Sequence, residues 1–194
     1  MEITAQHVAQ LRATTGAGMM DAKRALEEAQ GDVTKAAEIL RKKGMAKAEK
    51  RAGRETSQGR VHSYIHSNGK LGAMVEVLCE TDFVARNETF IGLCHDIAMH
   101  VSATDPRWAT REQVPAEVIE KEKEIYRAEV TGKPADVIEK ILSGKLEKFY
   151  SETVLLDQPF VKDEEKTVGE YVKEMIATIG ENIQIARFAR FQIG

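Results

Sequence analysis

The sequence predicts an α+β fold: three short amino-terminal helices, then a core with a small antiparallel sheet, flanking helices and a protruding helical hairpin. Three observations lead to this prediction. Residues 1–54 carry apolar residues at helical spacing. Residues 61–79 alternate apolar and polar residues on either side of Asn68-Gly69, a strong signal for a two-residue turn. Residues 116–156 are rich in charge and are interrupted at Gly132-Lys133-Pro134, which is typical of two antiparallel helices.

Composition favours a soluble globular protein of one or two domains. The 194 residues are 30% charged and 42% apolar, and the formal net charge is −3. Residues 1–54 nevertheless hold 11 Lys and Arg against 7 Asp and Glu. We therefore predict an amino-terminal helical module with a basic linker over residues 1–54 and a core domain over residues 55–194. The basic run 41–54 is best explained as a solvated helix, and no direct nucleic-acid binding is expected.

Several classes of function lack support in the sequence. The absence of a signal peptide pattern and of any long apolar run predicts a cytoplasmic protein that neither enters nor crosses a membrane. No phosphate-binding glycine loop and no Ser-His-Asp context are present, so neither an intrinsic nucleotide site nor an enzyme is expected. Cys94-His95 and His100 lack the paired spacing of zinc ligands, so no metal or other cofactor is expected. Cys79 and Cys94 lie in apolar patterns and indicate reduced, buried thiols.

The amino-terminal helices have clear boundaries and small apolar faces. Thr4 is a good N-cap, the second helix is expected to end at Gly31, and the third to run from Asp32 to Gly44. Their predicted buried positions are Ala22, Ala25, Leu26, Ala29, Val33, Ala36, Ala37 and Leu40. Between the first two helices, Gly16 and Gly18 permit a tight turn, and Met19 and Met20 follow. The two methionines either form an adaptable binding surface or help to fill the small core.

The strand over residues 71–79 leads directly to Asp82 and Phe83, at a predicted strand-to-helix junction. Two interpretations of this pair stand. On residue chemistry alone, the commoner one makes Phe83 a core residue and Asp82 a helix N-cap. The other makes the pair an exposed wedge, an aromatic ring beside a carboxylate, that acts on another protein. On the preceding strand, His62, Tyr64 and His66 share one face and are either surface residues or a contact patch.

The remaining elements follow from periodicity and capping. A helix is predicted to begin near Asn87, and Thr167–Glu170 is a capping box for a second helix that ends at Gly180. The last residues are strand-like, with apolar residues at alternate positions, a pattern that Arg187 interrupts. The predicted buried face of the helix near Asn87 consists of Phe90, Leu93, Cys94, Ile97 and Val101.

Three motifs occur in a distinctive order: Leu11–Asp21 (LRATTGAGMMD), Cys79–Ala85 (CETDFVA) and Gly180–Ile183 (GENI). Through them the chain resembles the bacterial translation elongation factor Ts family, and the resemblance covers essentially the whole chain. The length resembles the short form of the family, with one copy of the core subdomain. The protruding helical hairpin of that form matches residues 116–156.

The resemblance implies a guanine-nucleotide exchange factor that binds elongation factor Tu and promotes GDP release without covalent chemistry. It implies a ubiquitin-associated-like fold for the amino-terminal module, which docks on the partner's GTP-binding domain, while the Asp-Phe pair reaches toward the partner's magnesium site. It also implies a homodimer, in which His62, Tyr64 or His66 of the second chain contacts the partner. The partner-binding residues implied are Arg12, Met19, Met20, Thr81, Asp82, Phe83, Val84 and His66. The competing hypothesis is a ubiquitin-associated-like adaptor that binds a protein through residues 16–20 and has no exchange activity.

Overall fold

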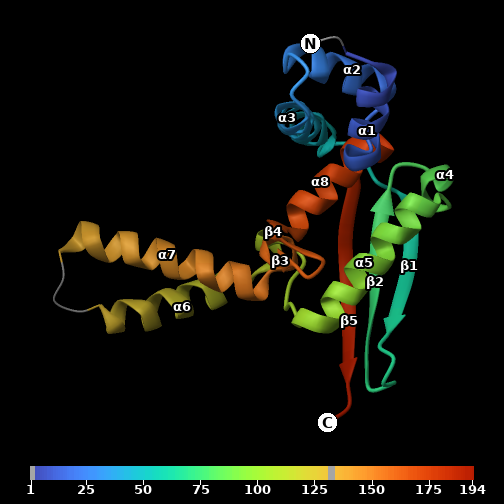
Figure 1. Cartoon of the computed structure of the whole chain (residues 1–194). Coiled ribbons are helices and arrows are strands. Elements are labelled where there is room, and N and C mark those ends of the chain that lie inside the picture. Colours follow the sequence, from blue (N-terminus) through green and yellow to red (C-terminus); the bar gives the residue numbers. More distant parts are fainter. Residues whose placement is uncertain (1–2, 131–133) are drawn as a thin grey trace. The chain divides into compact units, whose positions relative to one another are not determined.

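A computed structural model describes residues 3–130 and 134–194 of the chain, and the predicted α+β class is confirmed (Figure 1). The α-helices are α1 (Ala5–Thr15), α2 (Met19–Glu28), α3 (Val33–Arg51), α4 (Asp82–Ala85), α5 (Glu88–Thr104), α6 (Ala116–Glu129), α7 (Ala135–Thr153) and α8 (Val168–Ile179). The strands are β1 (Gln58–Ile65), β2 (Leu71–Cys79), β3 (Pro159–Phe160), β4 (Asp163–Thr167) and β5 (Ile183–Gln192). Short 3-10 turns lie at Arg111–Gln113 and Leu155–Asp157.

The chain divides into two compact units, each assembled from separate stretches of sequence. Unit 1 contains the residues up to Gly59 together with Leu78–Leu93 and Val172–Gln184. Unit 2 contains Arg60–Val77, Cys94–Tyr171 and Ile185–Gly194. The elements α5, α8, β1, β2 and β5 contribute to both units, and neither unit is a continuous segment of the chain.

The three amino-terminal helices of unit 1 form at the predicted caps. The Thr4 side chain accepts a hydrogen bond from the His7 amide at 3.3 Å, and the Asp32 carboxylate accepts one from the Lys35 amide at 3.0 Å. Alanines make up more than half of the core between the helices, and Val8, Leu11 and Leu26 fill the rest. The buried cluster consists of Val8, Leu11, Ala22, Ala25, Leu26, Ala29 and Ala36.

The third helix is longer than predicted, because Gly44 does not end it. Helix α3 continues through Gly44 to Arg51. A Cβ atom at Gly44 would lie 3.2 Å from the Cβ atom of Ala177 in α8, which is a tight contact. The glycine therefore permits close packing of another helix, and this packing outweighs its poor helix propensity of about 1 kcal/mol.

The three-stranded sheet has the order β1-β2-β5 and is antiparallel (Figure 1). The predicted hairpin forms, but the prediction of a two-residue turn is wrong. The His66 amide donates to the Leu71 carbonyl at 2.8 Å, so four residues lie inside the loop. Gly69 takes the expected left-handed conformation with φ +67°, and the Asn68 side chain accepts from the Lys70 amide at 2.9 Å. Asn68 thus stabilises a longer loop than its dipeptide signal suggests.

Helix α5 covers one face of the sheet, and its predicted buried positions are confirmed. In unit 2, the Arg190 guanidinium of β5 donates to the Ser102 carbonyl of α5 at 2.8 Å. The buried His100 ring has both nitrogens engaged: one within 2.9 Å of the Gln158 side-chain oxygen, the other accepting from the Val161 amide at 3.3 Å. Burial lowers the pKa of His100, and because both ring nitrogens are engaged within unit 2 the ring is a structural group.

The opposite face of the sheet carries exposed apolar side chains, and we call it the open sheet face. Arg187 on β5 lies on this side and pairs with Glu76 of β2, which explains why it interrupts the apolar parity of the strand. Ile65 lies across Gly72, where an added Cβ would come within 2.6 Å of its terminal methyl carbon. The exposed apolar side chains are Val61, Ile65, Met74, Phe191 and Ile193.

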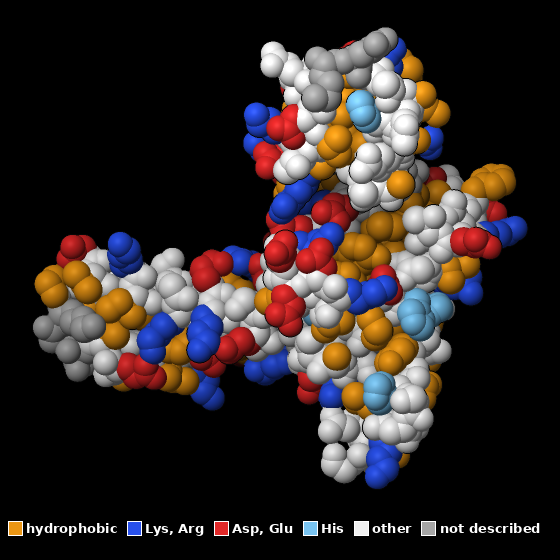
Figure 2. All heavy atoms as spheres, viewed as in Figure 1, with side chains coloured by type: hydrophobic (Ala, Val, Ile, Leu, Met, Phe, Trp, Pro, Cys, Tyr) orange, Lys and Arg blue, Asp and Glu red, His pale blue; other side chains and the backbone are white. Residues whose placement is uncertain are grey.

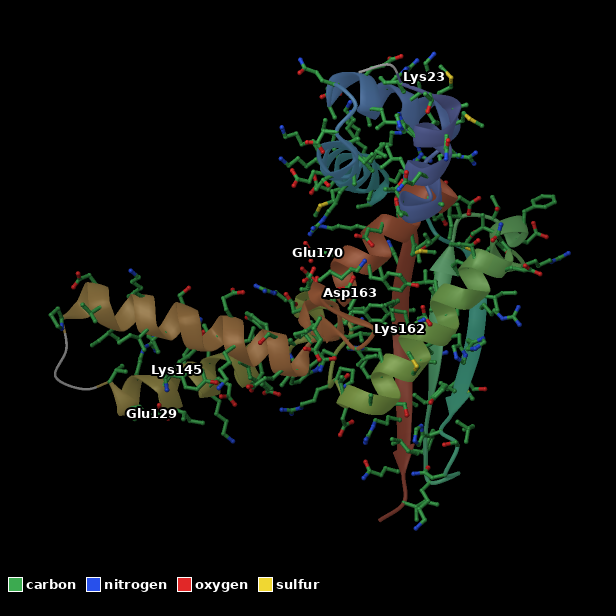
Figure 3. The ribbon with its side chains drawn as sticks, in the orientation of Figure 1. Lys23, Glu129, Lys145, Lys162, Asp163 and Glu170 are labelled. Carbon is green, nitrogen blue, oxygen red and sulfur yellow. The ribbon has the colours of Figure 1, made fainter. Side chains whose placement is uncertain are left out.

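Helices α6 and α7 of unit 2 run antiparallel, as predicted, and the predicted turn residues Gly132 and Lys133 lie outside the described residues. An ion pair between Lys145 and Glu129 links the two helices (Figure 3). At their base the Arg111 guanidinium binds Glu147 at 2.7 Å and Asp157 at 2.6 Å. This double pairing fixes the start of the hairpin.

The hairpin β3–β4 was not predicted, because residues 159–167 show no apolar alternation. The capping box after it is confirmed. The Glu170 amide donates to the Thr167 hydroxyl at 3.1 Å, and the Thr167 amide donates to the Glu170 carboxylate at 3.0 Å. Helix α8 ends at Gly180, with φ +94°, as predicted.

Candidate functional site

The Asp82–Phe83 pair lies on the one-turn helix α4, directly after β2 ends. Phe83 is 82% exposed, so the interpretation of this residue as core is wrong. The cap is also not Asp82: the Thr81 hydroxyl accepts the hydrogen bond from the Val84 amide at 3.4 Å. Figure 2 shows apolar atoms projecting at α4. A large aromatic ring held in solvent is costly to hydrate and is available to another molecule.

Asp82 is itself half-exposed and makes a local ion pair. Its carboxylate lies 3.0 Å from the guanidinium of Arg86, one turn further along the chain. Exposed pairs of this kind contribute little to stability, about 0–1 kcal/mol. The Asp82 side chain is 49% exposed, so its carboxylate is accessible beside the ring of Phe83, as the wedge interpretation requires.

The turn that carries this pair is held from a distant part of the sequence. The Glu181 carboxylate accepts hydrogen bonds from the amides of Glu80 and Thr81, at 3.1 and 3.0 Å, and from the Thr81 hydroxyl at 2.6 Å. Charge-assisted hydrogen bonds of this kind are among the stronger ones in proteins. The backbone just before α4 is thus anchored within unit 1.

The neighbouring residue, Asn182, ties the end of α3 to the same turn. Its buried side chain donates to the carbonyls of Ala52 and Arg54 at 3.3 and 2.8 Å. The backbone amide of Asn182 donates to the Glu80 carboxylate at 2.6 Å, and that carboxylate lies 3.5 Å from the Arg54 guanidinium. One hydrogen-bond network therefore joins the exit of the amino-terminal helices to the turn before α4.

Both methionines lie in solvent at the start of α2, directly after the loop of residues 16–18. Met19 is 58% exposed and Met20 is 59% exposed, so the alternative that one fills the core is wrong. Arg12 donates from its guanidinium to the Ala17 carbonyl at 3.2 Å, and Gly16 takes φ +65°. Arg12 thereby braces the turn that precedes the two flexible apolar side chains.

Part of the basic charge in the 41–54 run is paired within unit 1. Lys43 pairs with Glu28, and Lys47 lies 2.8 Å from the Asp21 carboxylate. Lys47 lowers the pKa of Asp21 through this hydrogen bond and its charge. Pairing of this kind weakens the positive field that a nucleic acid would require.

His66 lies at the start of the hairpin loop in unit 2, among other aromatic side chains. The Tyr64 hydroxyl is 3.0 Å from a ring nitrogen of His66. The ring of His62 meets His95 of α5 edge to face, with nitrogens 3.4 Å apart, and Figure 2 shows histidines at the surface beside α5 and β1. Burial and the neighbouring His95 lower the pKa of His62. His62 and Tyr64 therefore pack partly on α5, while His66 is exposed.

Comparison with known proteins decides the family. A model of the family described as elongation factor TS matches residues 2–194. Elongation factor Ts of Fervidobacterium nodosum is 60% identical over 196 aligned positions and covers the whole of both chains. That of Thermosipho melanesiensis is 58% identical over 99% of each chain, and that of Geobacter sulfurreducens is 55% identical over this whole chain and 91% of its own. The chain belongs to the elongation factor Ts family.

Membership in the elongation factor Ts family gives the chain a role as a translation elongation factor in protein biosynthesis. Two of the three motifs that carried the resemblance meet in unit 1, since Glu181 and Asn182 bind Glu80 and Thr81. From the sequence, Glu181 and Asn182 were known only as members of the motif Gly180–Ile183, and no role was predicted for either residue. No helix among residues 3–130 and 134–194 is long and apolar enough to cross a membrane.

Proposed function

We propose that this elongation factor Ts family member is a guanine-nucleotide exchange factor: it binds elongation factor Tu, promotes release of GDP and so allows GTP to rebind. The observation that carries the proposal is the exposure of Phe83, 82%, beside the accessible carboxylate of Asp82. An exposed aromatic ring on an anchored turn is suited to insertion into a partner. No covalent step and no cofactor of this chain are required, so the activity is not that of an enzyme in the chemical sense.

The proposed mechanism is reciprocal coupling between two binding events. If this chain binds nucleotide-free elongation factor Tu more tightly than the GDP-bound form, GDP binds the complex more weakly by the same factor. Each tenfold of that factor requires about 1.4 kcal/mol. The turn Thr81–Val84 supplies the differential contact in this scheme. Phe83 occupies an apolar site of the partner, and the charge of Asp82 disturbs the polar groups around its magnesium ion.

Docking is assigned to the amino-terminal module, residues 1–54, which we propose to be ubiquitin-associated-like. Its exposed pair Met19 and Met20 offers flexible apolar contact area, and the guanidinium of Arg12 braces the loop that precedes them. Contact through this surface holds the chain on its partner while the Asp-Phe turn acts. The place of action is the cytoplasm, where translation elongation proceeds.

The test is the release of a fluorescent GDP analogue from purified elongation factor Tu, with and without this chain. We expect the release rate to rise with concentration and to saturate. A chain that forms the complex but leaves the release rate unchanged would be an adaptor without exchange activity. Failure to form any complex would contradict the choice of partner.

We further propose that the chain is a homodimer that pairs through the open sheet face. The sheet has α5 on one side only, and Phe191 on the other side is 71% exposed. A shallow pocket of about 160 Å³ on this face is bounded by Ile65, Met74, Phe191 and Ile193. Burying each large apolar side chain contributes about 1.5–3 kcal/mol to the free energy of association, so pairing of this face with the same face of a second copy is favourable. In such a dimer His66 of the second copy contacts elongation factor Tu.

Light scattering at micromolar concentration is expected to give twice the 21.6 kDa mass of one chain. The variants Val61→Glu and Phe191→Glu should give the mass of one chain, because each would bury an unpaired carboxylate at the interface. Val137→Glu on α7 is the matched control, since it adds the same charge at an exposed apolar site away from the sheet. A wild-type mass of one chain at all concentrations would contradict the dimer.

A further inference from the structure

Phe83 cannot be held in place by packing of its own side chain, because that side chain is 82% exposed. Its position therefore depends on the backbone that precedes it. That backbone begins where β2 ends at Cys79 and enters α4 at Asp82, so only Glu80 and Thr81 lie between the strand and the helix. Whatever fixes these two residues fixes the backbone of α4 and the direction of the Cα–Cβ bond that carries the ring.

One carboxylate binds both connecting residues. One oxygen of Glu181 accepts the amides of Glu80 and Thr81, at 3.1 and 3.0 Å. The other accepts the Thr81 hydroxyl at 2.6 Å. Because that hydroxyl donates its proton to Glu181, its oxygen lone pairs face the Val84 amide that it caps at 3.4 Å. Glu181 thus determines both the start of α4 and the orientation of its cap.

Glu181 is itself placed by its neighbours on either side. Gly180 ends α8 with φ +94°, a conformation that favours glycine, and directs the chain toward β5. Asn182 is buried and binds the carbonyls of Ala52 and Arg54, which follow α3. The carboxylate therefore stands on a turn that is held on both sides, which makes it a rigid support.

We propose that Glu181 is a positioning residue for nucleotide exchange: it does not contact the partner, but it pre-organises the Thr81–Val84 turn so that Phe83 is presented in its active direction. This inference rests on the proposed exchange function and deepens it. Without the carboxylate, two backbone amides and the capping hydroxyl lose their acceptor, and the turn samples other directions. Positional precision of this kind affects the rate of the step more than the strength of docking.

The first experiment measures the isolated protein and does not depend on the exchange function. Hydrogen–deuterium exchange of the segment 80–85 is compared in the wild type, in Glu181→Ala, and in Glu164→Gln as a control at an exposed carboxylate in unit 2. We expect the amides of the segment to exchange at least about tenfold faster in Glu181→Ala only, with α2 and α3 unchanged. Unchanged protection of this segment would overturn the positioning role.

The second experiment measures GDP release from elongation factor Tu over a range of concentrations of each variant. In Glu181→Ala the saturating release rate should fall about tenfold or more, while the concentration that gives half of the maximal effect stays within about twofold of wild type. Glu181→Gln should be intermediate, because its remaining oxygen still accepts the two amides. A loss confined to the half-maximal concentration would place Glu181 in the docking surface and overturn the proposal.

A further variant covers the case in which Glu181→Ala does not fold. Thr81→Val keeps the shape of the side chain and the hydrogen bonds from the two backbone amides to Glu181, but it removes the hydroxyl. It should lower the saturating rate less than Glu181→Ala does. If the wild type itself fails to speed GDP release, the exchange function is wrong, and the hydrogen-exchange result still decides whether Glu181 positions the turn. If the wild type is active and both Glu181→Gln and Thr81→Val have its saturating release rate, the positioning role of Glu181 is wrong while the exchange function stands.

Discussion

Phe83→Ala is expected to remain folded and to lose most of its ability to speed GDP release from elongation factor Tu. Truncating a buried aromatic costs about 3–5 kcal/mol of unfolding free energy. Phe83 is 82% exposed, so the change here should stay within about 0.5 kcal/mol. The saturating release rate should nevertheless fall about tenfold to a hundredfold, the range of a typical coupling free energy of about 1–3 kcal/mol.

Asp82→Asn separates charge from shape at the same turn. It keeps the size of the side chain but removes the charge, so it should also impair release if the carboxylate acts on the partner's magnesium environment. Arg86→Ala is the matched control, because it breaks the ion pair of Asp82 at 3.0 Å and leaves the carboxylate in place. The measurements are the release rate at saturation and a melting curve for each variant. A Phe83→Ala variant that releases GDP normally would falsify the wedge mechanism.

The double variant Met19→Ala/Met20→Ala is expected to show the opposite kinetic pattern. Its saturating rate should equal that of the wild type, while the concentration for half of the maximal effect should rise about tenfold to a hundredfold. This range corresponds to about 1–3 kcal/mol, typical of an interface hot spot. Since the two side chains are 58% and 59% exposed, the fold of the amino-terminal helices should not change.

Val161→Ala, which trims another exposed apolar side chain in unit 2, is the control for the methionine variant. These substitutions also test docking more cleanly than deletion of residues 1–54. That deletion is expected to weaken binding strongly, but it removes Ala52 and Arg54, whose carbonyls bind the side chain of Asn182. Unchanged affinity in the methionine variant would exclude these two residues from the docking surface.

The sequence motifs located the candidate site at Asp82 and Phe83, and the structure decided between its two interpretations. Residue chemistry alone favoured a buried Phe83 and a capping Asp82, since most aromatics pack and most carboxylates at a helix start accept amides. The structure places Thr81 in the capping role and leaves the ring exposed. The carboxylate that binds this turn belongs to Glu181, about a hundred residues away in sequence, and no local pattern around Phe83 reveals such a partner.

The sequence by itself determined the features that depend on neighbours a few residues apart. The caps at Thr4 and Asp32, the capping box at Thr167 and the left-handed Gly69 all follow from local hydrogen bonds and backbone sterics. The buried faces of α2 and α5 follow from helical periodicity in the same way.

Only the tertiary structure decided the features that depend on distant segments. Helix α3 continues through Gly44, where it packs closely on Ala177 of α8, and the core of the amino-terminal helices is filled without either methionine. The open sheet face exists because α5 covers one side only. Burial is a property of which surfaces meet, so the same apolar residue becomes core or contact surface according to partners far along the chain.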